Sequence, residues 1–422
     1  RPYMNFTPPP EDSPMEDALV CTIYFYTGDN IGNQSRTTGP HISYDAGKSW
    51  EHMAWDIIIT NGIAVDSFGK WLYCACGNGV LASGDGGRNW RLSGGWEMAE
   101  IQDVKIGPES PLVVWAAGAY GLFLSEDGAN TWIRPGEPQP FRYTDRVLPD
   151  RDNGNHVLVG SETGLWVTND RGVSYTRVGP DAPIRSIIQD SRQTQVFWMG
   201  TDGMGLWKSV DSGYTWSQIE GTGDIVNRVV QNPAVPDWFI CGLNRGVSIS
   251  RDDGINWVTS TEGFSDNAAV YDVVFDNSNP LKIFAGVRDG FYVSDDEGLT
   301  WHTYTDENGY TILQNAVIFD LWQGELYRGD EEKGSIMPGT LVVGSELPDG
   351  DELRENFDPD YDSRVKALAD YLVNTTAYRL ESLEEGQHVD LMSAIAFIRE
   401  GKASDALWAV SYTHLRAHET VL

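Results

Sequence analysis

Basic residues are scarce in this chain, and it has no long apolar run. Only 30 of the 422 residues are Lys or Arg, against 62 Asp or Glu, which gives a formal charge of −32 at pH 7. Nucleic-acid binding needs a basic face that releases counterions, so the composition argues against a nucleic-acid partner. No apolar run approaches the roughly 18 residues of a membrane span. We therefore expect an acidic protein without a membrane span.

Cysteine and histidine are also few. The four cysteines, Cys21, Cys74, Cys76 and Cys241, are too scattered for a disulfide framework, and we expect buried thiols. The seven histidines show no HExxH or other paired spacing. The sequence therefore predicts no cofactor and no metal site. Calcium alone is left open, because acidic loops can bind it without a motif.

One eight-residue phrase, here called the repeat, returns seven times. Position one is Ser or Thr, position three an acid, position five usually Gly and position eight an aromatic residue. The copies are Ser43–Trp50, Ser83–Trp90, Ser125–Trp132, Thr168–Tyr175, Ser209–Trp216, Ser250–Trp257 and Ser294–Trp301. Successive copies begin 40 to 44 residues apart, which is typical of a stacked or circular array of one small unit.

Each unit of the array carries four strand patterns. In the fifth unit they lie in residues 183–190, 195–205, 206–211 and 215–221, and they are rich in Val, Ile and Trp and broken by Gly and Asp. Four short strands in a unit of this length predict a blade of a β-propeller, in which radial repetition protects the strand edges.

The first unit lacks its first strand, because Leu19 begins directly with the counterpart of the second strand. The segment Thr311–Leu321, after the seventh repeat, can supply that strand and so join the two ends of the array. This predicts an all-β, seven-bladed β-propeller. An eighth blade built from residues 324–334 and 339–346 is the alternative.

The repeat resembles the Asp box, or BNR repeat, of sialidases, sortilin-type receptors, xyloglucan-cleaving propellers and photosystem assembly factors. The resemblance covers Leu19 to Tyr310. It implies Asp-box turns between the third and fourth strands, away from the active face. In such a turn the acid accepts backbone N–H bonds, the Gly adopts a positive φ and the Trp packs between sheets. Ala129 and Tyr175 replace the usual Gly and Trp, and we expect weaker turns there.

The composition divides the chain into four parts: an N-terminal extension (1–18), the propeller (19–345), an acidic linker with a helical extension (346–410) and a tail that we expect to be non-native (411–422). Two amphipathic helical patterns, Ser363–Leu383 and Val389–Glu400, could pad the propeller, form a dimer or dock a protein partner. The chain starts at Arg1 with no visible leader, so we expect a trimmed start and an extracellular or periplasmic location.

Side chains on the first strand of each blade can converge on a ligand in the channel. We aligned these strands on the residue that closes each of them, from Asp66 in the first aligned strand to Asp320 in the last. The alignment places one residue of each blade at a common level: Gly62, Asp103, Arg146, Arg185, Arg228, Asp272 and Asn315. Three adjacent blades thus present Arg, the residue best shaped to bind a carboxylate through two hydrogen bonds. An anionic ligand explains this cluster, and so do structural ion pairs with Asp103, Asp145 or Asp272.

The three arginines resemble the triad by which sialidases hold the carboxylate of their sugar, although here they fall on adjacent blades and the FRIP-type strand of that family is missing. Loops of the same face add Glu162, Asp202, Arg245, Arg288 and Trp96. For glycoside hydrolysis, two carboxylates must flank the bond, and Asp103 and Asp272 are the candidate pair. Tyr271 is the nucleophile that the sialidase resemblance implies. A uronate lyase would instead use a Tyr or His base beside an Arg.

The sequence therefore predicts an exported propeller that recognises an anionic carbohydrate or another carboxylate-bearing ligand, with glycoside hydrolase or polysaccharide lyase activity as its enzymatic form. The alternative is a non-catalytic assembly or interaction protein, such as an assembly factor or a viral or cell-surface appendage. Such a protein would dock its partner through the propeller face and the helical extension.

Overall fold

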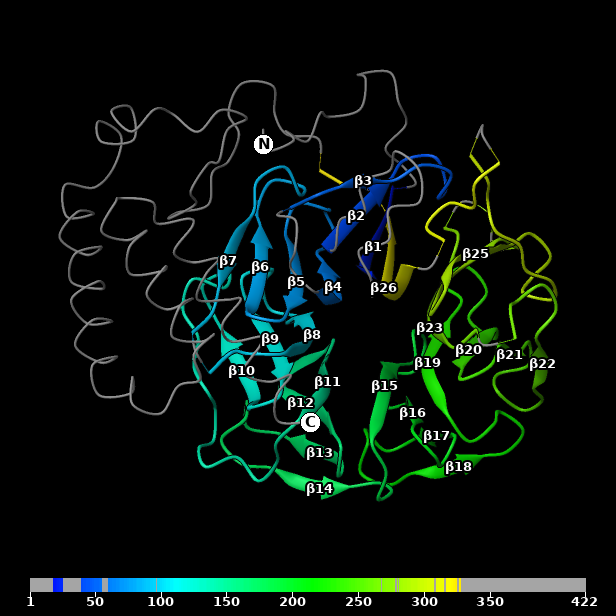
Figure 1. Ribbon diagram of the computed structural model, residues 1–422. Coiled ribbons are helices and arrows are strands. Elements are labelled where there is room, and N and C mark those ends of the chain that lie inside the picture. Colours follow the sequence, from blue (N-terminus) through cyan, green and yellow to red (C-terminus); the bar gives the residue numbers. More distant parts are fainter. Residues whose placement is uncertain are drawn as a thin grey trace, which may run out of the picture. The chain divides into compact units, whose positions relative to one another are not determined.

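Seven antiparallel sheets form blades around a common axis (Figure 1). The computed structural model describes residues 18–25, 39–54, 60–95, 97–266, 268–277, 279, 281–306, 309–314, 316–324 and 326–327. All of them belong to one compact unit, Met4–Val342. The all-β fold and the seven blades are confirmed. The predicted helices and the tail lie outside the described residues.

Blade 1 consists of β26 (Ala316–Gly324), β1 (Ala18–Phe25), β2 (Gly39–Ser43) and β3 (Glu51–His52). Blade 2 consists of β4 (Thr60–Val65), β5 (Leu72–Cys76), β6 (Gly79–Ser83) and β7 (Arg91–Ser93), and blade 3 of β8 (Ile101–Ile106), β9 (Val114–Gly118) and β10 (Gly121–Ser125). Blade 4 consists of β11 (Thr144–Asp150), β12 (Asn153–Ser161), β13 (Gly164–Thr168) and β14 (Thr176–Val178).

Blade 5 consists of β15 (Ile184–Gln189), β16 (Phe197–Thr201), β17 (Leu206–Ser209) and β18 (Ser217–Ile219). Blade 6 consists of β19 (Val226–Gln231), β20 (Phe239–Leu243), β21 (Val247–Ser250) and β22 (Val258–Ser260). Blade 7 consists of β23 (Val270–Phe275), β24 (Ile283–Val287) and β25 (Gly290–Ser294).

Blade 1 closes the ring, because its inner strand comes from the far end of the array. β26 pairs antiparallel with β1, with Ala18 opposite Gly324 and Phe25 opposite Ala316. The inner strands contact one another in the cyclic order β4, β8, β11, β15, β19, β23, β26 and back to β4. The prediction that the segment after the seventh repeat supplies the missing strand is thus confirmed, although this strand begins at Ala316 and not at Thr311.

Every inner strand carries a β-bulge at the same place. In β8, Ile101 and Asp103 pair with consecutive residues of β9, which leaves Gln102 as the extra residue. A bulge re-aims the side chains around it. We call the residue that follows the extra one the ring residue. The ring residues are Gly62, Asp103, Arg146, Ser186, Arg228, Asp272 and Asp320.

Two blades differ here from the sequence alignment. Arg185 is the extra residue of the β15 bulge, so Ser186 is the ring residue of blade 5. In β26 the ring residue is Asp320, which the alignment had used as the closing residue. Asn315 lies outside the described residues. The alignment was wrong at these two places because it let the spacing to the closing residue vary, whereas a bulge common to all blades keeps that spacing constant.

Apolar layers between neighbouring blades form the core. Between blades 5 and 6, for example, the buried rings of Trp198 and Phe239 lie 4.6 Å apart, centroid to centroid. Cys74, Cys76 and Cys241 are free, buried thiols in these layers, as expected, and burial raises the pKa of each. Burial of this apolar surface is the main favourable term in folding.

Each repeat forms a tight turn after the third strand of its blade. In blade 5 the Ser209 hydroxyl donates to Asp211 Oδ1 (2.8 Å), and that same carboxylate oxygen accepts the N–H of Thr215 (2.8 Å). Trp216 Nε1–H donates to the carbonyl of Gly213 (2.8 Å). The turn therefore satisfies its own polar groups and fixes the Trp ring against the sheet.

The turn with Ala129 keeps most of these bonds. The N–H of Ala129 donates to Ser125 Oγ at 2.8 Å, as the glycine N–H does in the other repeats. The indole N–H of Trp132 instead donates to Ser93 Oγ of blade 2, at 3.0 Å. The substitution thus redirects one hydrogen bond to the neighbouring blade.

Candidate functional site

Ring residues connect neighbouring inner strands at the channel. An inner strand has one edge without a strand partner, and its N–H groups need other acceptors. Four ring side chains accept the N–H that follows the ring residue of the next blade: Asp103 from Val147 (3.1 Å), Ser186 from Val229 (3.1 Å), Asp272 from Leu321 (2.7 Å) and Asp320 from Ile63 (2.6 Å). These side chains therefore act as hydrogen-bonding links between blades.

Arg228 joins blades 6, 7 and 1 at this level. Its Nε lies 2.8 Å from Asp272 Oδ1, and its Nη2 lies 3.4 Å from Asp320 Oδ1. The Asp272 side chain is 0% exposed. Burial raises the pKa of Asp272 well above its usual value, against the opposing charge of Arg228. Burial also acts to raise the pKa of Asp320, but the charges of Arg228 and Lys105 and the hydrogen bonds with Asp272 and Ile63 together lower it. Because both carboxylates are buried and the Arg228 side chain is 22% exposed, this group is a largely buried ion-pair network.

Arg146 and Arg185 form a second, more accessible group on blades 4 and 5. Arg146 Nε–H donates to the carbonyl of Arg185 (2.5 Å), and Arg146 Nη1–H donates to the carbonyl of Asp145 (2.7 Å). The guanidinium of Arg185, whose side chain is 38% exposed, lies between two carboxylates: Nη2 is 2.7 Å from Asp202 Oδ2 and Nη1 is 3.5 Å from Asp145 Oδ2. These contacts hold Arg185 at the mouth of the channel.

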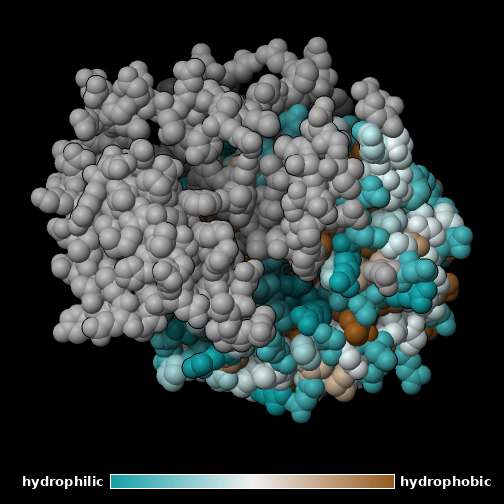
Figure 2. All heavy atoms as spheres, in the orientation of Figure 1, coloured by the Kyte–Doolittle hydropathy of each residue, from teal (hydrophilic) through white to brown (hydrophobic). Residues whose placement is uncertain are grey.

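Of the two acids beside Arg185, Asp145 is the less exposed, with 17% of its side chain accessible. Burial raises the pKa of its carboxyl, while Arg146 and Arg185 counteract that effect. Asp202 lies in the loop between β16 and β17 and is part-exposed. Of the two acids that face Arg185, Asp202 is therefore the more accessible to solvent. In the part of the central hollow that Figure 2 leaves uncovered, the visible described residues are mostly hydrophilic.

The other predicted site residues are more scattered. Tyr271 is the extra residue of the β23 bulge, and its ring packs against Phe319 with centroids 5.5 Å apart. Arg245 is exposed and lies 3.8 Å from Asp266. Arg288 is exposed in the turn between β24 and β25. Trp96 lies outside the described residues. The structure thus places Arg245 and Arg288 in exposed turns and Tyr271 beside Phe319.

Sequence reasoning missed Asp320 and Ser186 as ring residues. Both keep the spacing of four residues to the closing position that the other inner strands show, since Asp190 and Gly324 follow them by four. A constant spacing was the signal that could have found them. The same error made Arg185 look equivalent to Arg146 and Arg228.

Within the described ranges, no three His, Cys, Asp or Glu side chains are grouped so as to hold a metal ion. His41, beside the first repeat, is buried, and burial lowers its pKa to about 3, which keeps the imidazole neutral. A search of the described residues for a helix long and apolar enough to cross a membrane finds none.

No protein-family model and no curated protein matches the chain. An ancestral GH74 enzyme superposes with a TM-score of 0.50 and 18% identity, over 63% of this chain and 38% of its own. YCF48 from Cyanidioschyzon merolae has a TM-score of 0.48 and 15% identity, over 64% of this chain and 96% of its own. YCF48 bound to D1 peptide has a TM-score of 0.47 and 13% identity, over 65% of this chain and 93% of its own. The chain thus spans well under half of the GH74 enzyme. At these identities the likeness shows the fold alone, a seven-bladed β-propeller.

Proposed function

We propose that this chain is an exported Asp-box propeller that binds an anionic carbohydrate or another carboxylate-bearing chain at the mouth formed by Arg146 and Arg185. The partly exposed guanidinium of Arg185, held between Asp145 and Asp202, is the observation that carries the proposal. A ligand carboxylate that displaces Asp202 would keep the charge-assisted hydrogen bond of Nη2. The internal hydrogen bonds of the seven repeats support their assignment as Asp boxes.

The geometry favours binding over catalysis at the predicted carboxylates. Asp272 is fully buried against Arg228, and Asp103 accepts hydrogen bonds from Val104 and Val147 and pairs with Lys105 at 2.7 Å. A general acid or nucleophile must reach its substrate, and these contacts instead assign both side chains to the links between blades. Glycoside hydrolysis through Asp103, Asp272 and Tyr271, or uronate elimination, stays a prediction to be tested by product analysis.

The binding proposal is tested with Arg185→Ala and two acidic probes, 3′-sialyllactose and an oligogalacturonate, by isothermal titration calorimetry. Loss of a hydrogen-bonded charge pair is expected to weaken binding of the recognised probe about tenfold or more. Arg151→Ala is the matched control, because Arg151 has a similar exposure of 39% and lies after β11, at the opposite end of the inner strand. Equal affinity of wild type and Arg185→Ala for every probe would remove the proposal.

Asp202→Asn probes the competition at the same guanidinium. Removal of this internal carboxylate is expected to tighten binding of the acidic probe about two- to fivefold, the size of a part-exposed ion pair. Arg185→Ala in the same background should abolish that gain. If Asp202→Asn instead weakens binding, Asp202 orients Arg185 for the ligand and does not compete with it.

The alternative function is a non-catalytic interaction protein that docks a partner through its propeller face and its helical extension. The fold is shared by a GH74 enzyme and by YCF48 bound to D1 peptide, so it does not separate the two functions. A glycan array with no acidic ligand, together with a partner or oligomer that is lost when residues 358–422 are removed, would favour this alternative.

A further inference from the structure

The repeat turns form a continuous rim on the face opposite to Arg185. Side chains of neighbouring blades connect them: Arg171 Nη2 lies 2.8 Å from Glu126 Oε1 between blades 4 and 3, and Arg251 Nη2 lies 2.8 Å from Glu297 Oε2 between blades 6 and 7. The Tyr214 hydroxyl of blade 5 donates to Asn169 of blade 4 at 2.7 Å. We call this surface, from blade 4 to blade 7, the repeat rim.

Position six of the repeat is apolar and solvent-exposed on all four blades of the repeat rim. The exposed fractions are 73% for Val173, 44% for Tyr214, 76% for Ile255 and 45% for Leu299. In the other three repeats the same position is polar: Lys48, Arg88 and Asn130. Val210, at position two of the blade 5 repeat, is also exposed. One side of the propeller therefore carries an arc of apolar side chains at equivalent places.

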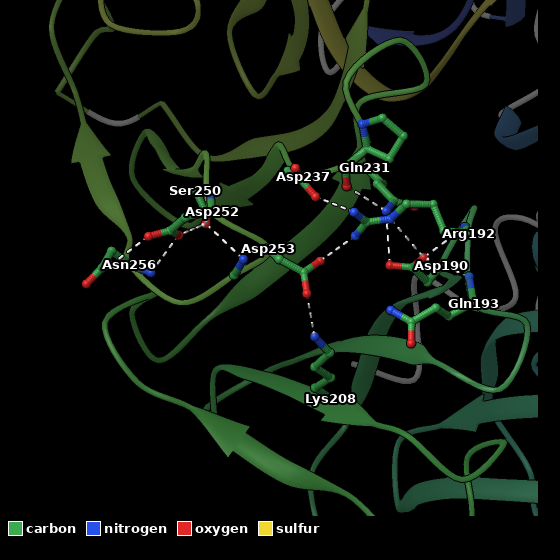
Figure 3. Close-up of polar contacts among 12 residues, drawn as sticks. Asp190, Arg192, Gln193, Lys208, Gln231, Asp237, Ser250, Asp252, Asp253 and Asn256 are labelled. Carbon is green, nitrogen blue, oxygen red and sulfur yellow. Dashed lines mark hydrogen bonds and ion pairs between the residues drawn. The ribbon is translucent and has the colours of Figure 1, made fainter.

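Carboxylates outnumber cations around this arc. Arg192 is held by three acids, with Nη2 2.6 Å from Asp253 and Nε 3.7 Å from Asp190 and with Asp237 on Nη1, and Lys208 lies 3.3 Å from Asp253 (Figure 3). Arg171 likewise faces two acids, Glu109 and Glu126. The acid at repeat position three adds one further charge in each blade, and hydrogen bonds within the turn keep it ionised.

We infer that the repeat rim is a docking surface for a partner protein segment that is both basic and apolar, such as an amphipathic helix with Lys or Arg beside its Leu or Ile residues. The apolar arc would bury the apolar face of that segment, and the surrounding carboxylates would pair with its cations. This surface is independent of the anion site at the opposite face.

Charge selects this occupant over the others. A second copy of the same rim would bring two acid-rich surfaces together, and acidic lipid headgroups or nucleic acid would be repelled in the same way. Exposed apolar side chains at repeat-equivalent positions of four consecutive blades also exceed what a merely solvated acidic rim requires.

The test uses the full chain and a helical Leu/Lys peptide of about 18 residues as probe, with affinity measured by fluorescence anisotropy. The double variant Val173→Ser, Ile255→Ser leaves every charge in place and is expected to weaken binding about tenfold or more. Asn130→Ser, at the same repeat position of blade 3, is the matched control and should bind like wild type. Val173, Ile255 and Asn130 are all exposed, so the melting temperature of the double variant and of the control should equal that of the wild type.

Equal affinity of the double variant and wild type would overturn the inference, since the peptide would then be held by charge alone. Binding of a Leu/Glu peptide as tight as that of the Leu/Lys peptide would overturn it as well. Sedimentation velocity decides the remaining occupant: a wild-type dimer that the double variant loses would assign the rim to a second copy and not to a basic partner.

Discussion

At the scale of the residue, each repeat places two consecutive residues in the left-handed region. In blade 6 these are Asp253, with φ +61°, and Gly254, with φ +77°. Position four tolerates a side chain, as Asp253 and Ser212 show. Position five is confined, because a Cβ on Gly254 would lie 2.4 Å from Cη2 of the buried Trp198. In blade 6 the glycine is therefore needed for space as much as for φ, whereas blade 3 accommodates Ala129 at the same position with φ +67°.

Gly254→Ala should accordingly destabilise the protein by about 2–4 kcal/mol, through both overpacking and backbone strain. Thermal melting followed by circular dichroism measures the change. Ser212→Gly, which relaxes a left-handed residue at position four, is the control and should alter stability by less than about 1 kcal/mol. A Gly254→Ala protein that melts like wild type would show that Trp198 moves aside at little cost.

The carboxylates of the repeat give a second prediction at this scale. Hydrogen bonds from the hydroxyl and the N–H of Ser174 lower the pKa of Asp170 to about 2. A folded pKa below the unfolded value means that Asp170 contributes stability above about pH 4 and loses that contribution as the pH falls toward about 2. Asp170→Asn should therefore show a smaller drop in melting temperature between about pH 5 and pH 2 than wild type. If the melting temperature of Asp170→Asn falls with pH as much as that of the wild type, the prediction is wrong. Asn130→Ser, which removes no titrating group, is the control and should keep the wild-type pH profile.

At the scale of the element, glutamines connect three pairs of inner strands near their ends. Gln231 of β19 donates through Nε2 to Asp190 Oδ2 (3.0 Å) at the end of β15, while its Oε1 accepts the N–H of Ser191 (2.7 Å). Gln189 and Gln323 make the same pair of bonds, to Asp150 and Arg151 and to Asp276 and Asn277. Each glutamine lies three residues after a ring residue. Two neighbouring inner strands are thus bonded at two levels where one of them carries a hydrogen-bonding ring residue and the other carries this glutamine.

Gln231→Ala is expected to destabilise the protein by about 1–3 kcal/mol, because it removes a donor from the buried Asp190 and an acceptor from Ser191. Chemical denaturation provides the measurement. Gln102→Ala removes a glutamine of the same channel whose bond to Glu100 O is 3.5 Å long, and it should cost less than about 0.5 kcal/mol. Equal effects of the two substitutions would argue against the glutamine link.

At the scale of the whole molecule, ring closure depends on residues that are far apart in the sequence. β26 pairs with β1, and Asp320 on β26 accepts the N–H of Ile63 on β4 and faces Arg228 on β19. Closure leaves two chemically different faces. One carries the arginine group of Arg146 and Arg185, and the other carries the repeat rim, where exposed apolar side chains are surrounded by carboxylates. A partner on one face therefore leaves the other accessible.

Asp320→Asn should weaken this closure by about 3–5 kcal/mol, since it leaves the largely buried Arg228 with one charged partner fewer. The melting temperature reports the loss of stability, and limited proteolysis near β26 reports opening of the ring. Asp181→Asn breaks an exposed ion pair with Arg177 and should cost less than about 1 kcal/mol. If Asp320→Asn melts like wild type, the backbone pairing of β26 with β1 is sufficient for closure.

The sequence by itself determined the seven blades, the closure by a strand from the far end and the turn at each repeat, because all of these follow from local periodicity and turn chemistry. Only the tertiary structure decided the level of each side chain in the channel. The bulge common to all inner strands sets the spacing from ring residue to closing residue at four, which takes Arg185 out of register and brings Asp320 into it, and the sequence pattern alone did not show which spacing to hold constant. It also decided that Arg228 lies between the buried Asp272 and Asp320 with 22% of its side chain exposed, while the side chain of Arg185 is 38% exposed, because these partners come from blades that are distant in the chain.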